Sequence, residues 1–84
     1  GQAYSWRASP RAAQYRVEVS VEPTFKHLLY VRKTSKQTIV LDPVKSNETV
    51  YWRVLAIDER GLPGSPSQIF RVMGPQARSA SATR

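Results

Sequence analysis

The chain has 84 residues and no cysteine, and thirteen Lys and Arg against six Asp and Glu give a formal net charge of +7. This length suits one small domain with a compact core, which no disulfide or thiolate metal site can reinforce. No apolar run approaches the roughly 20 residues of a membrane-spanning helix. The positive charge favours acidic partners of several kinds. The basic residues are spread along the chain without a long run, however, and this favours a solvated basic surface that binds no polyanion.

Alternation of apolar and polar side chains predicts six strands, because successive side chains of a strand point to opposite faces of a sheet. In chain order these are residues 2–7, 15–21, 28–31, 37–41, 50–57 and 68–72. The stretch 59–67 contains two Gly and two Pro residues and is predicted to be a loop. No helix of normal length is expected.

The predicted strand 15–21 has Tyr15 and three valines on one face and Arg16, Glu18 and Ser20 on the other. This pattern is typical of an antiparallel sheet with one buried and one solvated face. The strand 50–57 alternates in the same way and directs Trp52 into the core. The expected core consists of large inward side chains: Tyr4, Trp6, Tyr15, Val17, Val19, Phe25, Leu41, Trp52, Val54, Ala56 and Phe70.

Residues 1–72 are therefore predicted to form one domain, an all-β antiparallel sandwich. Residues 73–84 have almost nothing to bury, and we expect a disordered basic tail there.

The sequence lacks the residues of common catalytic sites. His27 is the only histidine and cysteine is missing, so we expect no Ser-His-Asp or Cys-His catalytic set and no multi-histidine metal site. Asp58 and Gly61 suit a turn after the strand 50–57, since Asp accepts backbone hydrogen bonds and Gly adopts positive φ. We expect no enzyme activity, no cofactor and no metal.

Several short motifs carry a family resemblance. They are Tyr4-Ser5-Trp6, residues 13–20, residues 25–29, Tyr51-Trp52-Arg53-Val54, Ala56-Ile57-Asp58 and Gly61-Leu62-Pro63-Gly64. In this order and spacing the chain resembles the fibronectin type III superfamily. It is similar to the fibronectin type III-like modules of bacterial envelope and secreted proteins, including those that accompany FecR-type domains.

The resemblance implies an immunoglobulin-like sandwich whose strands B, C, C′, E, F and G are the six predicted ones. It also implies a non-catalytic protein-interaction or spacer module of a larger envelope or secreted protein, in the periplasm or outside the cell. The family's strand A has no counterpart, because only five residues precede Trp6. Strand B would then have an open edge, at which a partner, a neighbouring copy or another part of the parent protein can pair. The family's corner tyrosine would fall at Val50.

With the family's sheet order, one solvated face carries arginines among apolar side chains on strands C, F and G. This candidate partner-binding face comprises Arg16, Tyr51, Arg53, Leu55, Ile57, Ile69 and Arg71. Arg and Tyr are common anchors of protein interfaces, so an acidic protein surface is one candidate partner. Nucleic acid or an acidic polysaccharide is the alternative. A third interpretation is that these long side chains only cover the sheet and pair across strands.

Overall fold

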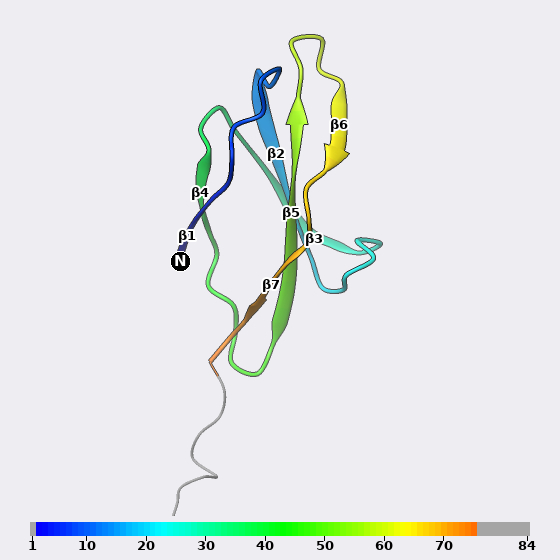
Figure 1. Cartoon of the computed structure of the whole chain (residues 1–84). Coiled ribbons are helices and arrows are strands. Elements are labelled where there is room, and N and C mark those ends of the chain that lie inside the picture. Colours follow the sequence, from blue (N-terminus) through cyan, green and yellow to red (C-terminus); the bar gives the residue numbers. More distant parts are fainter. Residues whose placement is uncertain (1, 76–84) are drawn as a thin grey trace, which may run out of the picture.

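The computed structural model describes residues 2–75, and this part of the chain contains strands and no helix (Figure 1). The strands are β1 (Gln2–Ser5), β2 (Gln14–Ser20), β3 (Leu28–Thr34), β4 (Thr38–Leu41), β5 (Thr49–Ile57), β6 (Pro63–Pro66) and β7 (Phe70–Met73).

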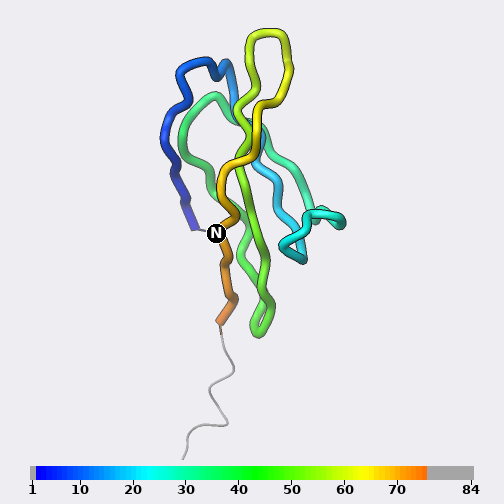
Figure 2. Tube along the Cα trace, turned by 45° about the vertical axis from the view of Figure 1, so that its right-hand side comes forward, coloured from blue at the N-terminus to red at the C-terminus, as the bar shows by residue number. Residues whose placement is uncertain are grey.

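The strands form two antiparallel sheets. β1 pairs with β4 in a two-stranded sheet, while the larger sheet has the order β3-β2-β5-β6, with β7 also paired to β5. In Figure 2 the β1–β4 layer, dark blue and green, lies beside the larger sheet that is centred on β5. The predicted all-β sandwich is confirmed.

The core lies between the two sheets and is built around Trp52. Its ring stacks on Phe70 at 4.4 Å between centroids, and the rings of Tyr4 and Trp6 lie 5.2 and 6.3 Å away. Val17 and Val19 on the neighbouring β2 are fully buried against it. Aromatic side chains bury large areas, so a small domain gains much of its stability from such a cluster. The predicted inward face of β2 and β5 is therefore correct.

Two parts of the larger sheet differ from the predicted strand pattern. β3 continues to Thr34, past the predicted end at residue 31. β6 lies within the stretch 59–67, which was predicted to be a loop. That prediction rested on its glycines and on Pro63 and Pro66, because proline usually interrupts a strand. As a short edge strand, β6 does not need those two N–H donors, so proline is tolerated there.

The chain after Val72 remains part of the sandwich as far as the structure describes it. Met73 belongs to β7, and the Gly74 N–H donates to the Glu48 carbonyl at 2.8 Å. A Cβ added to Gly74 would lie 1.9 Å from the Lys45 carbonyl oxygen, so only glycine fits this close approach. The ordered domain thus extends past the predicted boundary at residue 72. The predicted tail from residue 76 onward lies outside the described residues.

Two tyrosine hydroxyls accept hydrogen bonds from the backbone of segments outside their own strands. The Tyr15 hydroxyl accepts the Ser9 N–H at 2.8 Å, and the Tyr30 hydroxyl accepts the Asp42 N–H at 3.1 Å. Val50, at the position expected for a corner tyrosine, packs instead against the core. Strands β2 and β3 supply hydroxyl-to-backbone bonds that this position of β5 cannot make.

Candidate protein-docking surface

The outer face of the larger sheet carries the arginines that the sequence placed there. Register pairs Arg16 on β2 with Leu55 on β5, Glu18 with Arg53, and Tyr51 with Arg71 on β7. Directly opposed residues of an antiparallel pair point to the same face. The register therefore brings Arg16 and Arg53 beside Glu18, and leaves Arg71 beside Tyr51.

Glu18 is held between two arginines. Its Oε1 accepts a hydrogen bond from Arg53 Nε at 2.8 Å, and its Oε2 pairs with Arg16 Nη2. Glu18 is only 3% exposed, so the prediction that it would be solvated is wrong. The physical reason is that a carboxylate with two guanidinium partners can be buried, because its charge is paired and its oxygens are hydrogen-bonded.

Burial and the two arginines have opposite effects on the pKa of the Glu18 carboxyl. Burial alone would raise the pKa of the Glu18 carboxyl, since burial disfavours the charged form. The hydrogen bonds and positive charges of Arg53 and Arg16 act in the opposite direction and prevail, so its pKa lies below the ordinary 4.5. Glu18 is therefore a carboxylate at neutral pH, and both arginines are occupied by it.

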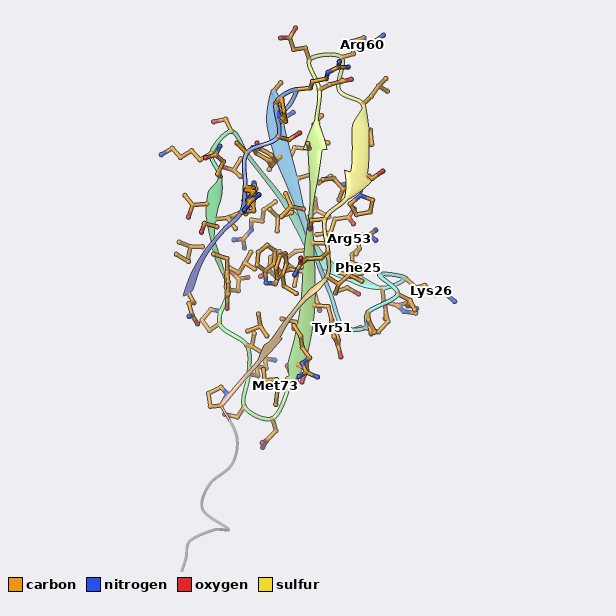
Figure 3. The ribbon with its side chains drawn as sticks, viewed as in Figure 1. Phe25, Lys26, Tyr51, Arg53, Arg60 and Met73 are labelled. Carbon is orange, nitrogen blue, oxygen red and sulfur yellow. The ribbon has the colours of Figure 1, made fainter. Side chains whose placement is uncertain are left out.

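Phe25 covers the same face. Its ring is buried, and the Arg53 guanidinium carbon lies 4.3 Å from the ring centroid. Figure 3 shows the two side chains side by side at β5. Because Arg53 lies on the outer face, Phe25 packs there and not in the cluster between the sheets, which corrects the predicted inward position. Its φ of 57° is unusual for a bulky residue, and burial and the stacking offset that strain.

Residues 22–27, which include Phe25, form a tight turn after β2. The Glu22 Oε1 accepts the N–H groups of Lys26 and His27 at 2.8 and 2.9 Å, and its Oε2 lies 3.0 Å from His27 Nδ1. The His27 N–H is the largest cause that lowers the pKa of Glu22 to about 2, with further bonds from the His27 ring and Ser20. Ser20, predicted to be solvated, is fully buried because this turn covers it. Val21, predicted inward, follows the strand end and is exposed.

The apolar members of the predicted face offer little surface to a partner. Leu55 and Ile57 are 9% and 5% exposed. Leu55 lies opposite Arg16 and Pro66, and Ile57 lies opposite Gln14 and Pro63. The long neighbouring side chains and the unpredicted β6 flank both residues, so the expectation that they contribute exposed apolar surface is wrong.

The other end of the face remains accessible. Arg71 is exposed beside a half-buried Tyr51, and Ile69 and Met73 are 44% and 53% exposed. Figure 3 places Tyr51 and Met73 along the lower part of β5 and β7. We call this set of four residues the β7 patch. Sequence reasoning missed Met73 because it was assigned to the tail, although its alternation with Arg71 was the available signal.

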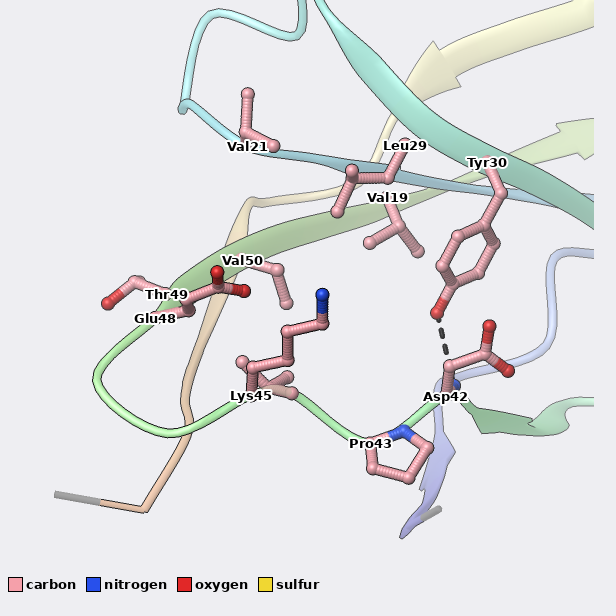
Figure 4. A pocket seen from close by; sticks show the side chains of 11 residues that line it. Val19, Val21, Leu29, Tyr30, Asp42, Pro43, Lys45, Glu48, Thr49 and Val50 are labelled. Atoms are coloured by element: carbon pink, nitrogen blue, oxygen red, sulfur yellow. Dashed lines mark hydrogen bonds between the residues drawn. The ribbon is translucent and has the colours of Figure 1, made fainter. Parts of the chain in front are cut away.

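Two hollows open between the sheets. One of about 580 Å³ has apolar walls that include Val19, Leu29 and Val50, and the Lys45 side chain points into it (Figure 4). The hydrogen bond from the Asp42 N–H to the Tyr30 hydroxyl lies at its edge. A second hollow of about 410 Å³ lies between the end of β1 and the β6–β7 connection. The walls of both are mainly apolar, but Asp42, Lys45 and Glu48 also line the first hollow, and Arg7 lines the second.

Within residues 2–75, His, Cys, Asp and Glu form no group of three or more that is arranged to hold a metal ion. That same part of the chain has no helix of the length and apolarity needed to span a membrane. Comparison with protein-family models, with curated proteins and with solved structures finds no match to this chain.

Proposed function

We propose that the chain is a non-catalytic, fibronectin type III-like module that docks a protein partner or spaces neighbouring domains. The sheet arrangement supports this: β1 and β4 pair as strands B and E of that family do, and β3, β2 and β5 lie in the order C′, C and F. With the segment β6 to β7 in the place of strand G, the pairing partners agree with those of the family.

The observation that carries the proposal is how the acidic side chains are used. Glu18 binds two arginines, Glu22 binds the turn at Lys26 and His27, and Asp42 pairs with Arg32 at 2.9 Å. Asp58 accepts the N–H groups of Arg60 and Leu62 at 2.9 Å each. Each of these four carboxylates is bound to a different part of the domain, so they do not form an acid–base pair with one another. Asp42 shares the lining of the 580 Å³ hollow with Glu48, but its carboxylate is paired with Arg32.

The exposed surface best suited to docking is the β7 patch. Arginine, aromatic residues and methionine are enriched in protein interfaces, and the patch combines all three with an exposed isoleucine. Arg71 gives it positive charge, and an acidic protein surface is its complement. Arg16 and Arg53, the other arginines of the predicted face, are both held in ion pairs with Glu18. The resemblance further suggests that the module belongs to a larger bacterial envelope or secreted protein.

Affinity capture from an envelope extract tests this proposal. The immobilised protein should retain a defined partner, and Arg71→Glu should lose it because the charge of the patch reverses. Lys33→Glu is the matched control, since Lys33 is exposed on β3 and lies outside the patch. Equal retention by both variants would refute docking through the patch. Equal loss in both, together with salt-sensitive binding to heparin or DNA, would instead identify a polyanion binder.

A further inference from the structure

The exposed edges of the two sheets are protected in different ways. On the free side of β4, Arg32 donates to the Val40 carbonyl at 3.4 Å and the Tyr30 hydroxyl accepts the Asp42 N–H. β3 carries basic side chains and β6 contains two prolines. Inward-pointing charges, prolines and covering side chains are the devices that keep sheet edges from pairing with other chains. β1, with the sequence Gln-Ala-Tyr-Ser, has none of these features.

Within residues 2–75, the edge of β1 that faces away from β4 pairs with no strand, and we call it the free edge of β1. It presents backbone groups at alternate residues. Trp6 donates its N–H to the Gln37 carbonyl at 3.1 Å, which makes Trp6 and Gln37 a hydrogen-bonded pair. Such pairs alternate along an antiparallel ladder. The backbone N–H and C=O groups of Ala3 and Ser5 therefore point away from β4. They are positioned to bond an added strand.

The 410 Å³ hollow adjoins this edge. Trp6 and Phe70 flank it, with Tyr15, Val54 and Ala56 as the inner part of its lining. The Trp6 indole Nε1 is buried and has no hydrogen-bond acceptor within residues 2–75. A strand paired to β1 would direct alternate side chains toward this hollow, because successive side chains of a strand point to opposite faces. An apolar side chain of the added strand would find aromatic contacts there.

The charged residues around the hollow indicate which kind of strand could add to β1. Arg7 lines the hollow, and no Asp or Glu is among its lining residues in the described chain. Continuing the ladder beyond Trp6 and Gln37 places Lys36 opposite Arg7. An acidic side chain near this end would lie beside Arg7, with Lys36 one strand further away, whereas a second copy would bring the same net charge of +7.

We infer that the free edge of β1 is a strand-accepting site for an extended, acidic segment of another protein. The segment adds to the two-stranded sheet through Ala3 and Ser5, places an apolar side chain in the hollow beside Trp6, and sets its acidic end against Arg7. Recognition of this kind takes its affinity from backbone bonds and its specificity from alternate side chains. The inference rests on the proposed interaction function but uses a different surface from the β7 patch.

Peptide titration followed by NMR of the full chain tests the inference. The probe is a synthetic peptide in which Val alternates with Thr behind two N-terminal Asp residues. At millimolar peptide we expect slowed hydrogen exchange at the Ala3 and Ser5 amides and shift changes around Trp6. A peptide with Lys in place of Asp should bind at least about tenfold more weakly, since a charge-assisted contact is worth about 1.5–3 kcal/mol.

Ser5→Pro removes one outward N–H and leaves the bonds to β4, so it should weaken binding while the melting temperature stays close to that of the parent. Ser5→Thr keeps the N–H and should bind like the parent. If Ser5→Pro does not fold, Arg7→Glu provides the test, because it should reverse the preference for the acidic peptide.

Three results would overturn the inference. One is no binding of the acidic peptide to the folded parent. Another is shift changes confined to Tyr51 and Arg71, which would support the β7 patch and reject the β1 edge. The third is a concentration-dependent dimer without peptide that Ser5→Pro abolishes, because the edge would then belong to a second copy. Loss of partner capture by Arg71→Glu alone bears only on the proposed function.

Discussion

Both faces of the larger sheet bury side chains of β2 and β5, yet different physics buries them. On the inner face, Trp52 and the β2 valines are covered by Tyr4 of β1 and by Trp6 just after it, and Trp52 also stacks on Phe70 of its own sheet. On the outer face, no second sheet is present among residues 2–75, and Arg16, Arg53 and Phe25 cover Glu18 and Leu55 instead. Long side chains with a polar tip can bury a sheet face without a second layer.

This difference predicts different sensitivities. Apolar burial does not depend on protonation, whereas paired charges lose their attraction when one partner becomes neutral. Mutations of the inner face should therefore act at every pH. Mutations of the outer face should act mainly where Glu18 and its arginines are all charged.

The largest effect is expected for Trp52→Ala. Removing this buried ring leaves a cavity among Tyr4, Trp6 and Phe70, and such substitutions cost about 3–5 kcal/mol, a large share of the stability of a small domain. Trp52→Phe should cost much less, because the buried Trp52 Nε1 has no hydrogen-bond acceptor in the described chain. Urea unfolding measures both. A Trp52→Ala variant as stable as the parent would refute the inner core.

A smaller loss is expected for Glu18→Gln. Two guanidinium groups would lose their counter-charge, and breaking a fully buried pair costs about 3–5 kcal/mol. The Arg16 and Arg53 side chains are 36% and 26% exposed, so solvent screens part of that loss and we expect about 1–3 kcal/mol. Glu59→Gln, at an exposed turn position, is the control and should change stability by less than about 0.5 kcal/mol. Equal effects would mean that the trio contributes no stability.

Alternation in the sequence was sufficient to predict the inner face but not the cover of the outer face. Tyr15, Val17, Trp52 and Val54 follow a period of two, and that period directs a side chain to one face or the other. It carries no information on whether that face meets water. The burial of Glu18 depends on Arg53, 35 residues away in sequence, and therefore on register between β2 and β5.

The same limit explains the other errors. Phe25 reaches the outer face through a left-handed backbone conformation, which sequence statistics assign to glycine or asparagine. Pro63 and Pro66 mark a loop by the usual signals, yet an edge strand accepts them. For the candidate docking surface, alternation was sufficient to place Arg16, Arg53 and Arg71 on one face of the sheet. The occupation of Arg16 and Arg53 by Glu18 required the three-dimensional structure.

Arg53→Lys sharpens the comparison further. Lysine keeps the charge but has no planar guanidinium to bind Glu18 while it stacks over Phe25. The loss of stacking and hydrogen-bond geometry should cost about 0.5–1 kcal/mol. Arg71→Lys should have no measurable effect on unfolding, since Arg71 is exposed on β7. If both substitutions behave alike, the Arg53–Phe25 contact does not stabilise the outer face.

The smallest effect is expected at the turn that closes the outer face, and it appears only in acid. The backbone N–H of His27 is the largest cause that lowers the pKa of Glu22 from 4.5 to about 2. A carboxyl whose pKa is lower in the folded state stabilises the protein above its unfolded pKa, and this contribution is lost as pH falls through the folded value. Between pH 4.5 and about 2, Glu22→Gln should therefore lose less stability than the parent. Thermal unfolding across this range measures the slope of stability against pH. Glu59→Gln, which lies outside the Glu22–His27 turn, should keep the slope of the parent. If stability falls as steeply with pH in Glu22→Gln as in the parent, the turn does not depend on the ionised carboxylate of Glu22.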